Sequence, residues 1–155
     1  MFSVTKSYRD YPAAHRQPGH DGHCRWVHGH NWGFDITFVC DLLDSNGFVV
    51  DVGKLGVVKK FLEEVFDHTL LLNDNDPLLE GIQGWAAGDG SEEGRLAKII
   101  AVPNCGMEGL AKFVLVEVTK LIDREVFDDS FERHLRPLEV VCWEDGKNRA
   151  TYHPA

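Results

Sequence analysis

The sequence lacks long hydrophobic runs. Its continuous apolar stretches, such as residues 99–102 and 114–116, are only a few residues long, whereas a membrane-spanning helix needs about 20 apolar residues. The first residues also lack the apolar segment and small-residue cleavage site of a secretory signal. We therefore expect a soluble protein in the cytoplasm that does not enter a membrane.

Positive charge is scarce as well. The 155 residues include 16 Lys and Arg against 25 Asp and Glu, which gives a formal net charge of −9. Binding to nucleic acid generally needs a basic face that displaces counterions from phosphates, so we expect no nucleic-acid partner. A small anionic substrate remains compatible with this charge, because a metal ion and a few local cations can set the sign inside one cleft.

Closely paired cysteines are missing too. The chain has four cysteines, and no two of them have CxxC spacing. This argues against a zinc ribbon or a disulfide framework. Cys40 and Cys142 lie in apolar, strand-like runs typical of inert core positions. Cys24 differs, because it lies among His, Gly and Arg residues where core packing does not account for it.

The hydrophobic content, in contrast, is sufficient for a core. Hydrophobic residues make up 43% of the chain, and we expect residues 1–155 to form a single domain. Apolar residues alternate between 32 and 40, which predicts a strand. Asn46-Gly47 then predicts a hairpin turn into a second strand at 48–51.

Two helices and another hairpin are expected further along the chain. Helical spacing of apolar residues predicts one helix over 52–66 and another along a stripe from Leu110 to Ile122. A last hairpin is expected from 138–144 and 149–152. Because hairpins imply antiparallel pairing, the predicted class is α+β, with both helices on one face of an antiparallel sheet.

An acidic segment at about 74–95 interrupts this order. It is rich in Asp, Asn, Gly and Glu and is predicted to be an irregular, exposed insert. Its run from Gly88 to Gly94 superficially suggests a phosphate-binding loop. That run is acidic, follows no predicted strand and opens no helix, so we reject this interpretation.

Histidines concentrate near the N-terminus, where five of the eight lie between residues 15 and 30. His28 and His30 are two residues apart at the entry to a strand, so their side chains point the same way. His15 leaves the first strand nearby, and three neutral histidines with an open position are the layout of a catalytic zinc site. Histidine-rich loops are often only polar surface, and His20 and His23 are assigned to that class.

Several further residues suit chemistry beside such a metal. Cys24 lies four residues before His28, an awkward place for a ligand but suitable for a thiol that faces a substrate. Asp67-His68 pairs a carboxylate with an imidazole, as in proton transfer, although for this pair taken alone capping of a helix C-terminus is the better explanation. Glu108 and Glu144 are two further carboxylates to consider. A favourable interaction with the positive end of a helix is the simple explanation for Glu108, and a charge at the edge of a strand is the simple explanation for Glu144.

The order of these motifs resembles the 6-pyruvoyl-tetrahydropterin synthase family over nearly the whole chain outside the insert. The resemblance rests on Ala-Ala-His-Arg at 13–16, Cys-x3-His-Gly-His-Asn-Trp at 24–32, Val-Asp-Val at 50–52, Asp-His at 67–68, Leu-Asn at 72–73, Glu108 and Glu144. Three residues between the cysteine and His-Gly-His are similar to the bacterial 6-carboxy-tetrahydropterin synthase branch of queuosine biosynthesis. The animal-type synthases have a longer gap.

This resemblance implies the tunnelling fold. In that fold each subunit supplies a four-stranded antiparallel sheet with two helices on one face. Three subunits close a twelve-stranded barrel, and two trimers stack into a homo-hexamer. Closure of the barrel protects exposed sheet edges, and the resemblance places active sites between subunits.

The resemblance also implies the roles of individual residues. His15, His28 and His30 would bind Zn2+, and Cys24 would act as general base or acid. Asp67 and His68 would relay its proton. Glu144 would anchor the pterin ring, since a carboxylate can accept two N–H donors, and Glu108 would assist recognition.

The implied reaction converts 7,8-dihydroneopterin triphosphate to 6-carboxy-tetrahydropterin, with loss of triphosphate and acetaldehyde. One segment departs from the family. Many members have Pro-Thr-x-Glu before the second helix, where this chain has Cys105-Gly106-Met107-Glu108, and the threonine region contacts the pterin. A pyruvoyl-type synthase, a dihydroneopterin aldolase-like activity and a non-catalytic pterin-binding module therefore stay open as alternatives. A zinc-stabilised structural protein is disfavoured, because structural sites usually have four protein ligands.

Overall fold

The computed structural model describes residues 1–122 and 132–154. In this part of the chain a six-stranded mixed sheet has the order β4-β3-β1-β2-β5-β6. The strands are β1 Phe2–His15, β2 His28–Cys40, β3 Thr69–Asn73, β4 Ile99–Val102, β5 Arg136–Glu144 and β6 Asn148–Tyr152. The α-helices are α1 Gly56–Phe66, α2 Leu79–Ala86 and α3 Met107–Leu121, and 3-10 turns lie at His23–Arg25 and Val52–Lys54.

The long hairpin of β1 and β2 forms the centre of the sheet. Its register runs from Phe2 opposite Cys40 to His15 opposite His28, with an irregularity between Tyr8 and Tyr11. The period-two pattern of β2 places one set of side chains, including Trp32 and Phe34, in the core, as a half-buried strand requires. The predicted strand over 32–40 is therefore confirmed.

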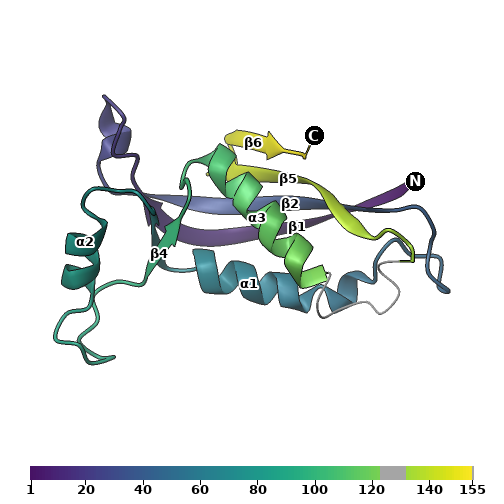
Figure 1. The fold of residues 1–155 in the computed structure, drawn as a ribbon, viewed down its shortest axis with the longest axis horizontal. Coiled ribbons are helices and arrows are strands. Elements are labelled where there is room, and N and C mark those ends of the chain that lie inside the picture. The colour runs from purple at the N-terminus through teal and green to yellow at the C-terminus, as the bar shows by residue number, and fades with distance from the viewer. Residues whose placement is uncertain (123–131, 155) are drawn as a thin grey trace.

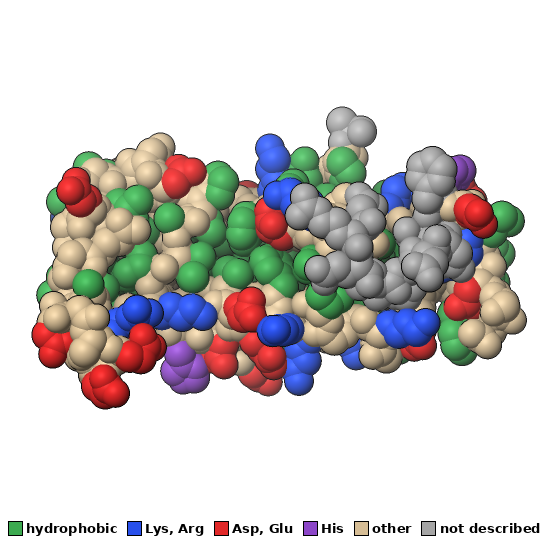
Figure 2. Space-filling view, turned by 60° about the horizontal axis from the view of Figure 1, so that its bottom comes forward, with side chains coloured by type: hydrophobic (Ala, Val, Ile, Leu, Met, Phe, Trp, Pro, Cys, Tyr) green, Lys and Arg blue, Asp and Glu red, His purple; other side chains and the backbone are tan. Residues whose placement is uncertain are grey.

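Helices α1 and α3 cover the same face of the sheet (Figure 1). The buried residues of α1 are Val58, Leu62 and Phe66, and those of α3 are Leu110, Ala111, Val114, Leu115 and Val118. Their spacing is the 3.6-residue period of an amphipathic helix. Figure 2 shows apolar side chains gathered over one part of the surface and charged side chains of both signs along its lower edge.

The expected four-stranded sheet with two helices is wrong in detail, although the α+β class and the final hairpin are confirmed. β3 pairs with β1 in parallel, and β4 pairs with β3 in parallel. Both added strands are short, with five residues around three leucines in β3 and four apolar residues in β4, and their pairing partners depend on tertiary structure. Helix α2, moreover, lies within the insert that was expected to be irregular.

The hairpin predicted at Asn46-Gly47 is also wrong, because residues 48–51 form no strand. Asp44 Oδ1 accepts hydrogen bonds from the backbone amides of Asn46 and Phe48 at 2.9 and 2.8 Å. These bonds close a local Asx-type loop in place of a ladder. In the described part of the chain, no helix combines the length and the apolar character that crossing a membrane requires.

Candidate metal centre

Three histidines meet where β1 ends and β2 begins. The register places His15 opposite His28, and His30 follows His28 on the same side of its strand. One ring nitrogen from each of the three lies within 4.8 Å of those of the other two. His15 is buried, and His28 and His30 are half-buried. The structure thus brings together the three residues that sequence reasoning chose as metal ligands.

The Nδ1 atom of each histidine faces an oxygen acceptor. The contacts are His15 Nδ1 to the Cys105 carbonyl oxygen at 2.7 Å, His28 Nδ1 to the Trp26 carbonyl oxygen at 2.7 Å, and His30 Nδ1 to Asp145 Oδ2 at 2.6 Å. Because carbonyl and carboxylate oxygens only accept, each Nδ1 carries a proton, and wherever the ring is neutral its lone pair therefore lies on Nε2. Metal-binding histidines commonly use this arrangement.

The Nε2 atoms converge without satisfactory protein partners. His15 Nε2 lies 3.1 Å from His28 Nε2, so two lone pairs face each other unless a cation lies between them. His30 Nε2 is buried and has no hydrogen-bond partner among the described residues. Burial lowers the pKa of His15, which favours the neutral ring that ligates metals. This donor set fits a catalytic zinc ion, which typically has three protein ligands.

Glu144 lies at the end of β5, beside the three histidines. Its Oε1 atom is 2.7 Å from His30 Nε2 and 4.0 Å from His15 Nε2. The nearer contact lies within ion-pair distance but lacks hydrogen-bond geometry, which is why His30 Nε2 remains unsatisfied. Glu144 is not part of the group of atoms that could share one ion, although its carboxylate lies directly beside two of the three ring nitrogens.

Cys24 lies in the 3-10 turn His23–Arg25 within the loop that joins β1 to β2. The residue is half-buried, and its thiol is free. Its carbonyl oxygen accepts a hydrogen bond from the Gln17 amide at 2.8 Å, which ties the turn to the residues just after β1. The loop therefore holds Cys24 at the same end of the sheet as the metal centre, while the thiol stays outside the cluster of histidine nitrogens.

Asp67 and His68 contact each other at the end of α1. His68 Nδ1 lies 2.6 Å from Asp67 Oδ1, and both side chains are exposed. The His68 backbone has φ of 56°, a conformation that a non-glycine residue adopts at some cost. Its amide donates to the Pro12 carbonyl oxygen. Within the described residues this pair makes no hydrogen bond or ion pair to Cys24 or to the three histidines.

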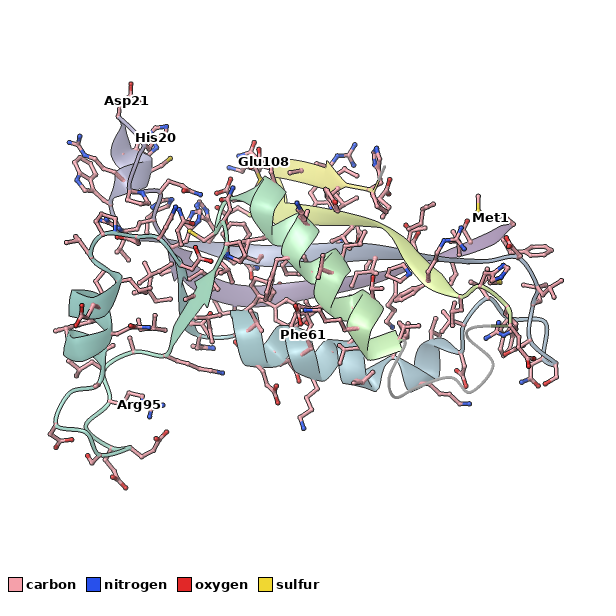
Figure 3. All side chains as sticks on the ribbon, in the orientation of Figure 1. Met1, His20, Asp21, Phe61, Arg95 and Glu108 are labelled. Atoms are coloured by element: carbon pink, nitrogen blue, oxygen red, sulfur yellow. The ribbon has the colours of Figure 1, made fainter. Side chains whose placement is uncertain are left out.

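A polar cavity of about 510 Å³ opens beside Gln17, two residues after His15. Its lining residues are Gln17, Gly19, His20, Asn73, Asn75, Pro103, Asn104 and Glu108. Figure 3 shows Glu108 at the start of α3 and His20 on the loop after β1. The ends of β1, β3 and β4 supply most of the remaining lining. The amide and carboxylate groups suit a heterocycle that carries both donors and acceptors.

Other residues around the centre escaped sequence reasoning. Asn73 Oδ1 accepts from the Cys105 amide at 2.8 Å, and the Cys105 carbonyl in turn holds His15. The Asn31 amide and then the His30 side chain lower the pKa of Asp145. In the sequence Asp145 is only the first residue of an Asp-Gly turn, so no local signal connects it with His30.

Arg16, which is half-buried, and Asp76, which is buried, form an ion pair that was also missed. Arg16 Nε lies 2.7 Å from Asp76 Oδ2, and the second bond of this bidentate pair is 3.0 Å long. The Asp76 side chain is fully buried. Burial opposes its ionisation, but hydrogen bonds from Arg16 and the Leu78 amide lower the pKa of Asp76 overall. The acidic insert is thus fastened to the residue that follows His15.

Together, the mixed sheet and the converging histidines define an α+β protein with a candidate three-histidine metal centre at one end of its central hairpin. Comparison with known families makes this class specific. The family model described as 6-pyruvoyl tetrahydropterin synthase matches residues 3–155 of this chain. The chain therefore belongs to the 6-pyruvoyl tetrahydropterin synthase family, as its motifs predict.

Curated relatives carry the name of one branch of this family. The chain is 37% identical over 68 residues to the 6-carboxy-5,6,7,8-tetrahydropterin synthase of Rickettsia felis, covering 43% of this chain and 49% of the relative. A longer alignment, to the Aquifex aeolicus protein of the same name, is 27% identical over 130 residues and covers 83% of this chain and 75% of the relative. The chain thus spans about half the length of the first relatives it matches.

Solved structures share the fold across almost the whole chain. An uncharacterised protein from Wolinella succinogenes superposes with a TM-score of 0.76 at 20% identity, covering 99% of this chain and 98% of that one. The 6-pyruvoyl tetrahydropterin synthase of Plasmodium falciparum gives 0.65 at 16% identity, with 98% coverage of both chains. At these identities the likeness establishes the tunnelling fold alone.

Proposed function

We propose that this protein is a zinc-dependent lyase that converts 7,8-dihydroneopterin triphosphate to 6-carboxy-5,6,7,8-tetrahydropterin. Triphosphate and acetaldehyde leave, and one water molecule is consumed. The observation that carries the proposal is the convergence of three histidine Nε2 atoms at the end of the sheet where the loop with the half-buried Cys24 also lies. The names of the curated relatives support the choice of product branch.

Metal binding and substrate binding are assigned to different residues in this proposal. His15, His28 and His30 would hold Zn2+, and the bound ion would supply Lewis acidity for the hydroxyl groups of the substrate side chain. Glu144 accepts N–H groups of the pterin ring, since its carboxylate lies next to the histidines and can receive two donors. Glu108 contributes a further acceptor from the edge of the cavity.

Proton transfer is assigned to Cys24, Asp67 and His68. The Cys24 thiolate removes a proton from the substrate side chain and returns it at a neighbouring atom. Asp67 orients His68 through its 2.6 Å contact with Nδ1, which leaves Nε2 free to exchange a proton. Both side chains are exposed in the single chain, so we propose that a neighbouring subunit completes this part of the site.

An open sheet edge supports such an assembly. β1 pairs with β3 only from Ala13 to His15, and in the described residues no strand lies along that side of its first eleven residues. Exposed edges of this length are normally protected. We propose a homo-hexamer built from two trimeric barrels, acting in the cytoplasm in queuosine biosynthesis.

Incubation of the zinc-loaded protein with 7,8-dihydroneopterin triphosphate, with products read by mass spectrometry, tests the reaction. Release of acetaldehyde and 6-carboxy-tetrahydropterin is expected. A 6-pyruvoyl product would move the protein to the other synthase branch. If the zinc-loaded hexamer bound a pterin without converting it, the lyase assignment would be wrong and a binding module would remain. The segment from Asn104 to Glu108 bears directly on this result, since it lacks the proline and threonine common in the family.

A further inference from the structure

Among the described residues, Asp145 is the one charged group that accepts a hydrogen bond from an Nδ1 atom of the three histidines. His15 and His28 are held by backbone carbonyls of Cys105 and Trp26. His30 is held by the Asp145 carboxylate at 2.6 Å. A charged acceptor binds an imidazole N–H more strongly than a neutral carbonyl does, so the three ligands are not held equally.

Both carboxylate oxygens of Asp145 accept hydrogen bonds from the first residues of β2. Oδ2 faces His30 Nδ1, and Oδ1 accepts from the Asn31 backbone amide at 2.7 Å. The Asp145 amide in turn donates to the Asn31 carbonyl oxygen. The register of β2 and β5, with Trp32 opposite Glu144, brings the turn between β5 and β6 against the start of β2. Asp145 itself has φ of 53°, a left-handed conformation that Asp and Asn tolerate better than most residues.

We propose that Asp145 is a positioning residue that holds His30 in its Nδ1–H tautomer and thereby completes a carboxylate–histidine–metal triad. This proposal rests on the proposed metal site. Asp145 acts through His30, since it contacts no other histidine of the group. A carboxylate that accepts a hydrogen bond from the non-ligating ring nitrogen orients the imidazole and raises the basicity of the ligating nitrogen.

Asp145→Asn is the discriminating substitution. The Asn31 amide can only donate, so the asparagine must turn its Oδ1 toward it and its NH2 group toward His30. That NH2 group requires an acceptor, which moves the imidazole proton from Nδ1 to Nε2 and removes the ligating lone pair. We expect the dissociation constant for Zn2+ to rise about 10- to 100-fold. Asparagine retains the size of the side chain and the positive φ, so the turn is preserved.

Asp10→Asn supplies a matched control. Asp10 has φ of 69°, and its Oδ1 accepts from the Asn31 side chain at 3.1 Å, but it contacts no histidine. This variant changes the net charge by the same amount at the same neighbour. Its affinity for Zn2+ should match that of the wild type.

The experiment measures Zn2+ affinity by chelator competition on wild-type protein and on the Asp145→Asn, Asp10→Asn and His28→Ala variants. Long-range ¹H–¹⁵N spectra of the metal-free proteins report the His30 tautomer, which a merely structural role of Asp145 would leave at Nδ1–H. Weaker Zn2+ binding together with an Nε2–H tautomer in Asp145→Asn alone is expected. If Asp145→Asn binds Zn2+ like the wild type while His28→Ala does not, the positioning role is refuted and the metal site stands. If His28→Ala also binds normally, the metal site itself is wrong.

Discussion

Cys24 is the residue whose role separates catalysis from metal binding. Its thiol lies outside the group of histidine nitrogens, so truncation should not disturb the metal. We expect Cys24→Ala to retain Zn2+ at the wild-type stoichiometry and to lose at least about 100-fold in kcat, the usual contribution of a positioned acid or base. Metal analysis and turnover on the same sample check this. Full activity in the variant would remove Cys24 from the mechanism.

The histidine cluster could be predicted from sequence because it depends on local geometry. His28 and His30 share a side of one strand, and His15 precedes a loop that returns to that strand. The residues that hold these rings could not be predicted in the same way. Cys105 is 90 residues away from His15 and Asp145 is 115 residues away from His30, and only the paired strands bring them together.

At the scale of elements, the Arg16–Asp76 pair links the insert to the end of β1. Asp76→Asn should leave the half-buried Arg16 without its counter-ion, which should cost up to about 3 kcal/mol in the free energy of unfolding at neutral pH, the lower end of the range for a buried pair. The unfolded Asp76 takes up a proton near pH 3.9, and the folded one only at lower pH because its pKa is lowered. The contribution of the Asp76 carboxylate to stability is therefore fully present above about pH 3.9, the pKa in the unfolded chain. It is lost as the pH falls through the lower pKa of the folded protein.

Urea denaturation at pH 7 and at pH 3 measures this effect. The deficit of Asp76→Asn relative to wild type should shrink on acidification. Asp74→Asn is the matched control, because Asp74 is exposed and lies two residues away in the same insert; it should stay near wild type at both pH values. A deficit for Asp76→Asn that is equal at the two pH values would contradict the ion-pair explanation.

The elements themselves were predictable to different degrees. β2 and α3 have clear periods of 2 and 3.6, and both are confirmed. β3 and β4 lack a period long enough to reveal that they pair in parallel beside β1. α2 was missed because Gly81 and Gly84 interrupt it and acidic residues follow it, although Leu78, Ile82 and Trp85 have helical spacing.

At the scale of the whole molecule, the unpaired side of β1 favours assembly of several chains. A chain that left this edge exposed would risk unspecific pairing. We expect six chains per particle by light scattering after gel filtration. Turnover per chain should fall on dilution into the concentration range where trimers dissociate into single chains. Asp67 and His68 would then lose the neighbouring subunit whose site they complete. An active monomer would contradict the proposal that sites lie between subunits.

The most direct test of the central claim is a titration of the metal-free protein with Zn2+, with bound metal and turnover of 7,8-dihydroneopterin triphosphate followed together. The three converging Nε2 atoms predict one ion per chain, activity that rises in step with occupancy, and loss of both in His28→Ala. Full turnover in the metal-free protein, or equal Zn2+ binding by His28→Ala, would contradict the account.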